Sequence, residues 1–233
     1  MTTLMEILEA AGSLLVGMGG RLALSIAGGL ALAIPAVLLG VGIHALRQRR
    51  ARAVPMEDGL AWRPGAYFAP NHTWLAPGRR TGEFTVGVDD LARHILPSVT
   101  SVELPRPGMD VHRGDPIVVL RAGGRTVRMG APVDGKVMRV NPAVRRDPGL
   151  VHREPYGGGW LFTLAPADAA YMRLPQDREA GGWLSAERTR LSRFVESELG
   201  LAAADGGALV EPLPAALGEE GWRKVVFAFL HAA

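Results

Sequence analysis

Short apolar or alternating runs, separated by turn residues, follow one another through the middle of the chain. Five of these runs are rich in β-branched or aromatic residues and are bounded by Gly, Pro or Asp: residues 84–88, 117–120, 126–129, 136–140 and 160–164. Gly123-Gly124 lies between two of them and predicts a tight hairpin turn, because glycine readily adopts positive φ. Residues 89–96 predict a short helix capped by Asp89 or Asp90. We therefore expect a mainly β domain, a sandwich or half-barrel, between about residues 65 and 168.

Helical periodicity returns in the C-terminal part of the chain. Residues 184–199 predict a helix with Ser185 as its cap. Residues 219–231 predict a final helix, whose apolar stripe consists of Trp222, Val225, Val226, Phe229 and Leu230. This stripe either packs on the β domain or forms a partner-docking face with Trp222 and Phe229 at its centre.

A long apolar run lies near the N-terminus. Residues 22–46 contain few polar side chains, and about 20 apolar residues suffice to span a bilayer. The pattern predicts a transmembrane helix at residues 21–46. Small residues, at Gly28, Gly29 and Gly40, offer surfaces where a partner helix can approach closely.

Basic residues are unevenly distributed around this run. Only Arg21 precedes it, whereas four arginines follow it: Arg47, Arg49, Arg50 and Arg52. The positive-inside rule then predicts a single-pass inner-membrane protein with its N-terminus outside, in the periplasm, and its C-terminal domain in the cytoplasm. The same arginines are candidate contacts for anionic lipid head groups.

These patterns divide the chain into five predicted parts. They are an N-terminal interfacial helix (1–20), the transmembrane helix (21–46), a basic juxtamembrane linker (47–64), the β domain (65–168) and a C-terminal helical extension (169–233). A poorly ordered terminus is the alternative for the first part. Trp62, in the linker, is a further candidate docking residue.

Composition changes this picture in three ways. Hydrophobic residues make up 48% of the 233, which agrees with a membrane part. Cysteine is absent, which excludes disulfides, thiolate metal sites and a cysteine nucleophile. Lys136 and Lys224 are the only lysines, so the net charge of +3 comes from arginines, several of them beside the apolar run. Membrane topology explains this charge better than nucleic-acid binding does.

No group of residues predicts catalysis. The six histidines lack the paired spacing of metal ligands, and we expect no metal site. Asp89-Asp90 suits helix capping better than acid–base chemistry, and Gly157-Gly158-Gly159 lacks the Lys-Ser/Thr of a phosphate-binding loop. His44 is a candidate contact for a cofactor or lipid at the predicted anchor, or a plain interfacial residue. We expect that the protein is not an enzyme.

Residues 67–168 resemble the H protein of the glycine cleavage system, the lipoyl carrier of that pathway. The resemblance rests on several motifs: His72-Thr73-Trp74, Val86–Asp90, Val102–Pro105, Gly114-Asp115, Pro132–Gly135 and Glu154–Leu161. It implies a lipoyl-carrier-like β fold, with His72 making a structural hydrogen bond in the core. It also implies a lipoyl-lysine at a hairpin tip.

The lipoyl-lysine position falls on a residue with no amine. Counted from Gly114-Asp115, it falls on Gly124, and the acidic position before it falls on Arg121. Arg125 is adjacent, but a guanidinium is not the amine nucleophile that lipoylation acylates. We therefore expect no lipoyl cofactor, although lipid or pigment at the anchor stays open.

The sequence favours a structural function. We expect a membrane-anchored accessory subunit of an integral membrane complex, and the host that we expect is a photosynthetic or respiratory complex. We expect no nucleic acid as a partner. The alternative is a membrane-tethered carrier or regulator in glycine cleavage or lipoyl metabolism.

Overall fold

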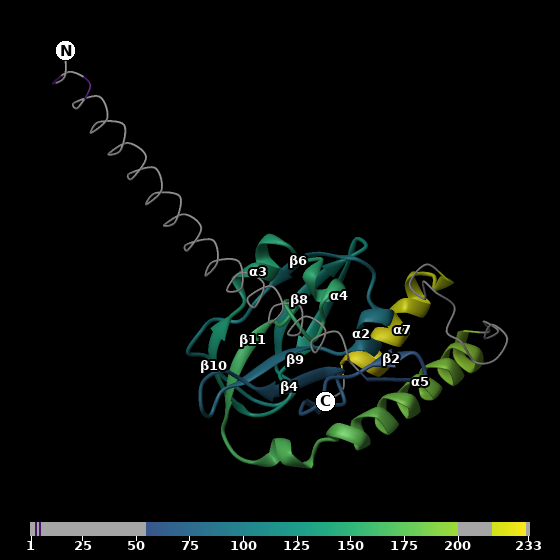
Figure 1. Cartoon of the computed structure of the whole chain (residues 1–233). Coiled ribbons are helices and arrows are strands. Elements are labelled where there is room, and N and C mark those ends of the chain that lie inside the picture. Colours follow the sequence, from purple (N-terminus) through teal and green to yellow (C-terminus); the bar gives the residue numbers. More distant parts are fainter. Residues whose placement is uncertain (1–2, 4, 6–54, 200–215, 232–233) are drawn as a thin grey trace. The chain divides into compact units, whose positions relative to one another are not determined.

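The computed structural model describes residues 3, 5, 55–199 and 216–231 (Figure 1). The predicted transmembrane helix at 21–46, with Gly28, Gly29 and Gly40, lies outside the described residues, as does the arginine cluster of residues 47–52. Within the described ranges, none of the helices has the length and apolar content needed to cross a membrane.

The β domain contains short antiparallel strands in three sheets. The strands are β1 (Met56–Glu57), β2 (Leu60–Ala61), β3 (Tyr67–Phe68), β4 (Thr73–Pro77), β5 (Phe84–Val88), β6 (Val99–Glu103), β7 (Asp110–Val111), β8 (Pro116–Ala122), β9 (Arg125–Gly130), β10 (Gly135–Val140) and β11 (Phe162–Pro166). The larger sheet has the order β3-β4-β5-β11-β10-β7, the smaller one β6-β8-β9, and β1 pairs with β2. The prediction of a mainly β domain is confirmed.

Strand β11 begins later than the sequence predicted. The apolar run starts at Trp160, whereas the strand starts at Phe162. The backbone carbonyl of Trp160 instead accepts a hydrogen bond from the side-chain amide of Asn141, at 2.7 Å. Trp160 is therefore part of the loop that Asn141 fixes, and pairing with β10 starts only at Phe162.

Helices close the ends of the sheets and form the C-terminal extension. They are α2 (Asp90–Ile95), α3 (Pro142–Arg146), α4 (Leu150–Arg153), the 3-10 turn η1 (Ala170–Arg173), α5 (Asp177–Leu199) and α7 (Glu219–Leu230). The predicted cap of α2 is confirmed, because the Asp89 carboxylate accepts the backbone N–H of Ala92 at 2.8 Å. Ser185 is not a cap, since it lies inside α5 and its hydroxyl binds the carboxylate of Asp58.

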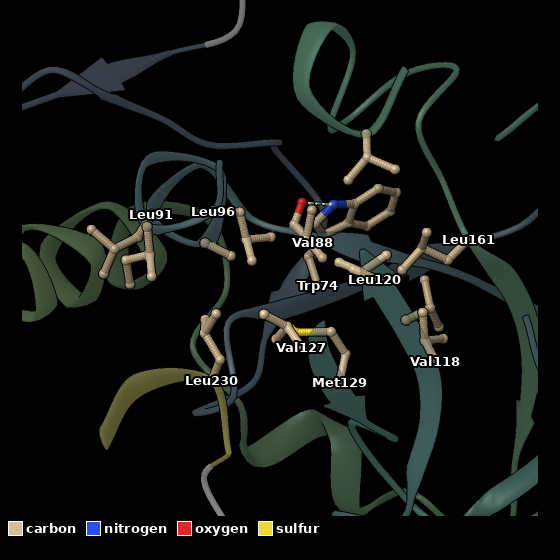
Figure 2. Close-up of a cluster of buried hydrophobic side chains, with 14 of the residues drawn as sticks. Trp74, Val88, Leu91, Leu96, Val118, Leu120, Val127, Met129, Leu161 and Leu230 are labelled. Atoms are coloured by element: carbon tan, nitrogen blue, oxygen red, sulfur yellow. Dashed lines mark hydrogen bonds between the residues drawn. The ribbon is translucent and has the colours of Figure 1, made fainter. Parts of the chain in front are cut away.

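One apolar core joins the sheets to the C-terminal helices. Figure 2 shows Trp74 within it, donating its indole N–H to the carbonyl of Val88 at 2.9 Å. Leu230 of α7 points into the same cluster as Val127 of β9, and both are fully buried. The described residues from 55 onward thus belong to one compact unit, and α5 and α7 complete its core.

Glycine is required where strand β5 crosses the central tryptophan. A Cβ atom at Gly87 would lie 2.8 Å from two ring carbons of Trp74, closer than carbon atoms approach in a packed core. The indole therefore lies flat against the backbone of β5. This close contact fixes the Trp74 ring between β5 and the loop at Pro155, whose carbonyl accepts the same N–H at 3.2 Å.

Candidate functional site

The hairpin of β8 and β9 has the tightest turn available to two antiparallel strands. Ala122 pairs with Arg125, which leaves only Gly123 and Gly124 in the turn. Their φ angles are +56° and +78°, and two successive positive φ angles define the type I′ turn that matches the twist of a hairpin. The turn predicted from the Gly-Gly pair is confirmed.

The two glycines have different surroundings. A Cβ atom at Gly123 would lie 2.9 Å from the Cβ of Pro97, so this side of the tip rests on the segment after α2. Around Gly124, no atom of the described residues lies within 4 Å of such a Cβ. The carbonyl of Pro97 is itself held by the Nε2 atom of His152 at 2.9 Å. The tip is therefore supported from one side and open at Gly124.

Arginines flank the tip, and each is already paired. Arg121 reaches the carboxylate of Glu103 at 3.0 Å across the outer face of the sheet. Arg125 reaches Glu219 of α7 at 3.1 Å, and its guanidinium lies 4.8 Å from the ring centroid of Trp222. The tip therefore presents two compensated cations and no nucleophile.

The lysines lie elsewhere and have other neighbours. Lys136 lies within strand β10 and its amine is 3.4 Å from the carboxylate of Asp110. Lys224 is on α7, where its amine is 3.7 Å from Glu220. An acyl group attached through an amide needs a lysine amine, and the hairpin tip has none. The residues at the tip do not fit a lipoyl group.

A buried ionic network lies at the turn before β4. His72 is completely buried, and its Nδ1 atom is 2.8 Å from the Asp89 carboxylate. Its Nε2 atom is 3.5 Å from Glu187 of α5, which is longer than a hydrogen bond. Burial alone lowers the pKa of His72, but the two carboxylates outweigh it and raise the pKa to about 9. His72 is thus an imidazolium at neutral pH.

The same network joins α5 to α7. Arg190 contacts Glu187 at 2.6 Å, and its guanidinium lies 4.0 Å from the ring centroid of Phe229. Burial raises the pKa of Glu187, yet the cationic His72 and Arg190 lower it further than burial raises it. Since no solvent reaches His72, its contacts within this network hold the fold together. The core hydrogen bond predicted for His72 is present.

One open groove, about 420 Å³ in volume, lies at the ends of β7, β10 and β11. Its charged side chains bind neighbours in the protein. Asp134 accepts the backbone N–H of Arg113 at 2.6 Å, and Lys136 faces Asp110. Across residues 55–199 and 216–231, no three His, Asp or Glu side chains come together to hold a metal ion. Both carboxylates of the groove and its lysine are therefore already engaged within the protein.

Of the predicted docking residues, the structure describes three, and these are buried or half-buried: Trp62, Trp222 and Phe229. Trp222 is 4% exposed and Phe229 is 0% exposed, because α7 packs on the β domain. This packing is the first of the two alternatives for this helix. Trp62 is half-buried against the core. Glu187 and Arg190 are not among the residues predicted from the sequence, where the only local sign of the pair is its spacing of one helical turn on α5.

Comparison with known proteins places the β domain in a family. Residues 66–180 match the family described as glycine cleavage H-protein. The glycine cleavage system H protein of Thermus thermophilus is 35% identical over 117 residues, which are 50% of this chain and 88% of that protein. The chain belongs to the glycine cleavage H-protein family. The family predicted from the motifs is confirmed.

A further relative gives the same result. The glycine cleavage system H protein of Alteromonas mediterranea is 39% identical over 103 residues, covering 44% of this chain and 79% of that protein. A crystal structure of the H protein from Mycobacterium marinum matches 47% of this chain and 89% of its own at 28% identity, with a TM-score of 0.43.

These findings correct two predictions made from the apolar N-terminal run. The relatives are named as H proteins of the glycine cleavage system, and the described part of this chain has no helix able to span a membrane. The predicted inner-membrane location, with the N-terminus in the periplasm, is therefore wrong. The same findings overturn the assignment to a photosynthetic or respiratory membrane complex.

Proposed function

We propose that this protein is an H-protein homologue without a lipoyl group, and that it acts as a non-catalytic regulator by binding enzymes of glycine cleavage or lipoyl transfer. One observation carries the proposal. The β8–β9 hairpin has a tight two-residue turn, Gly124 stands where the motif count puts the lipoyl-lysine, and neither lysine of the chain belongs to this hairpin. A domain that resembles the carrier without its attachment point can compete with the carrier.

The intact core supports a binding role over loss of function. The ion pair of His72 with Asp89, the capping of α2 and the close contact of Trp74 with Gly87 are all in place. These features hold the hairpin on a rigid base. A rigid surface binds with a smaller loss of conformational entropy, which favours recognition by an enzyme that already recognises H proteins.

Acylation is tested by intact mass. The full chain is produced in cells that contain a lipoyl-attaching enzyme, with the Thermus thermophilus H protein as the positive control. We expect the control to gain the lipoyl mass and this protein to keep its unmodified mass. A lipoyl increment that maps to Lys136 or Lys224 would contradict the proposal.

Competition is tested with the enzymes themselves. Lipoylation of the Thermus thermophilus H protein and its use by glycine cleavage enzymes are measured at increasing concentrations of the full chain. We expect saturable inhibition by this protein. A variant with Arg121→Glu, which reverses charge beside the tip, is expected to inhibit less, whereas Arg173→Glu, an exposed change on η1, is the matched control. Equal rates at every concentration would refute the regulatory role.

A further inference from the structure

Helix α7 is an addition that this chain makes to the family domain. The match to the family ends at residue 180, whereas α7 comprises Glu219–Leu230. Its contacts are with β9, α2 and α5. Figure 1 shows α7, in yellow, running beside α2. The surface of α2 and β9 beneath it therefore belongs to the family domain, and its cover does not.

The contact beneath α7 is mainly apolar. The helix buries a stripe formed by Trp222, Val225, Val226, Phe229 and Leu230. The Trp222 indole N–H donates to the carbonyl of Ile95, at the end of α2, with a distance of 3.2 Å. Without α7 this face of α2 and β9 would be a contiguous apolar patch with one directed hydrogen-bond acceptor. Such patches are typical of protein-docking sites.

The N-terminal turn of α7 is attached directly beside the hairpin tip. Glu219 pairs with Arg125, the residue that closes the turn at Gly124, and Trp222 lies under the same guanidinium. The Glu219 side chain is 73% exposed, so this attachment is at the surface and is weak. Any protein that grips the tip from this side meets α7.

We propose that the face formed by α2 and β9, next to the hairpin tip, is a docking surface for an amphipathic helix of the α7 type, and that α7 is its built-in competitor. A helix that fits this surface has an acidic first turn that pairs with Arg125 and a tryptophan that donates a hydrogen bond to the Ile95 carbonyl. An aliphatic stripe follows the tryptophan. The partner that displaces α7 is an enzyme of glycine cleavage or lipoyl transfer, an assignment that rests on the function proposed above.

The experiment controls the position of α7 in the full chain. Since the sequence has no cysteine, Arg125→Cys with Glu219→Cys can be joined by a short bismaleimide, which locks α7 onto the hairpin. The matched control is Asp110→Cys with Lys136→Cys, a similarly close pair on β7 and β10 that involves neither α7 nor the hairpin tip. Trp222→Ala loosens the helix. Glu219→Arg loosens it more mildly, through an exposed charge, and so guards against misfolding of the tryptophan variant.

The probe is a fluorescent peptide of residues 216–231, titrated against each protein. Because tryptophans at the centre of an interface carry much of its binding energy, we expect Trp222→Ala to bind the peptide at least about tenfold more tightly than the wild type. Glu219→Arg should bind more tightly by a smaller factor, and the locked protein should not bind. Equal affinity of the wild type, the locked protein and both loosened variants would overturn the proposal.

The same proteins are then tested with the enzymes. Inhibition that increases in Trp222→Ala and disappears in the locked protein confirms that α7 controls the docking surface. Peptide binding in the expected order without any enzyme inhibition leaves the docking surface standing and refutes the regulatory function. Equal inhibition by the locked and loosened proteins supports the regulatory function but refutes the proposal that α7 controls it.

Discussion

Among the turns of this domain that use the left-handed region of the backbone, the turn at His72 and the hairpin tip are held there by different interactions. His72, before β4, has a φ of +55° and is completely buried against Asp89. Gly123 and Gly124, at the hairpin tip, have φ angles of +56° and +78° and are exposed. A side chain in this region costs roughly 1–3 kcal/mol, whereas glycine adopts it freely.

The difference separates a turn held by tertiary contacts from a turn held by its own glycines. At His72 the backbone strain is offset by a buried ion pair, so the turn depends on contacts with α2 and α5. The tip needs only glycine and the support of Pro97. Within the part of the chain that the structure describes, nothing packs against Gly124, so the core does not exclude a side chain there. The geometry of the tip thus depends on its own glycines, whereas that of the His72 turn depends on the core.

The largest expected effect comes from removing the anion of the His72 turn. Asp89→Ala leaves the His72 imidazolium buried opposite only Glu187 and removes the cap of α2. We expect a loss of about 3–5 kcal/mol in the free energy of unfolding, measured by denaturant titration of the full chain. Asp110→Ala, which removes an exposed partner of Lys136, is the control and should change little. Similar values for both variants would show that the buried pair is not special.

The pH dependence comes next in size. The pKa of His72 is raised from 6.5 to about 9 in the folded protein, so its charge stabilises the fold fully below pH 6.5. That contribution declines above pH 6.5 and is gone once the pH has passed about 9, a loss of about 3 kcal/mol. His72→Asn removes the titration while tolerating positive φ, and its stability should vary less between pH 6.5 and 9.5. A parallel decline in both proteins contradicts the assignment to His72.

A smaller effect is expected at Gly87, where the backbone of β5 contacts the ring of Trp74. Gly87→Ala forces a methyl group against the Trp74 ring, and we expect a loss of about 1–3 kcal/mol. The matched control is Gly182→Ala, on the exposed face of α5, where no atom lies within 4 Å of a Cβ. This change should stabilise the protein by roughly 0.5–1 kcal/mol through helix propensity. A lower melting temperature for Gly87→Ala together with a higher one for Gly182→Ala supports the contact with Trp74. A higher melting temperature for Gly87→Ala argues against that contact.

The smallest effect is expected at the tip. Gly124→Ala meets no neighbour and carries only the cost of a left-handed backbone, about 1 kcal/mol. Gly123→Ala adds a collision with Pro97 and should destabilise the protein more. Denaturant titration of both variants gives the comparison. If Gly124→Ala proves the more harmful of the two, the tip is not open as the structure shows it.

Much of the local structure was predictable because short-range rules determine it. The Gly-Gly pair specified the hairpin turn, and Asp89 specified the start of α2. The alternating pattern of β9 matched its burial, with Val127 and Met129 inside. The resemblance to H proteins added the hydrogen bond of His72 and the position of Gly124 in the family's frame. Element ends were less predictable, as the misplaced cap at Ser185 shows.

The sequence by itself determined that the hairpin tip has no lysine and that glycine occupies the turn, because residue identity and φ preference are local properties. Only the tertiary structure decided that His72 is charged, since its pKa depends on Asp89 and on Glu187, 115 residues further along the chain (187 − 72). It also decided that α7 packs beside the tip with Trp222 buried. Contacts between residues far apart in sequence follow from packing, which no local pattern encodes.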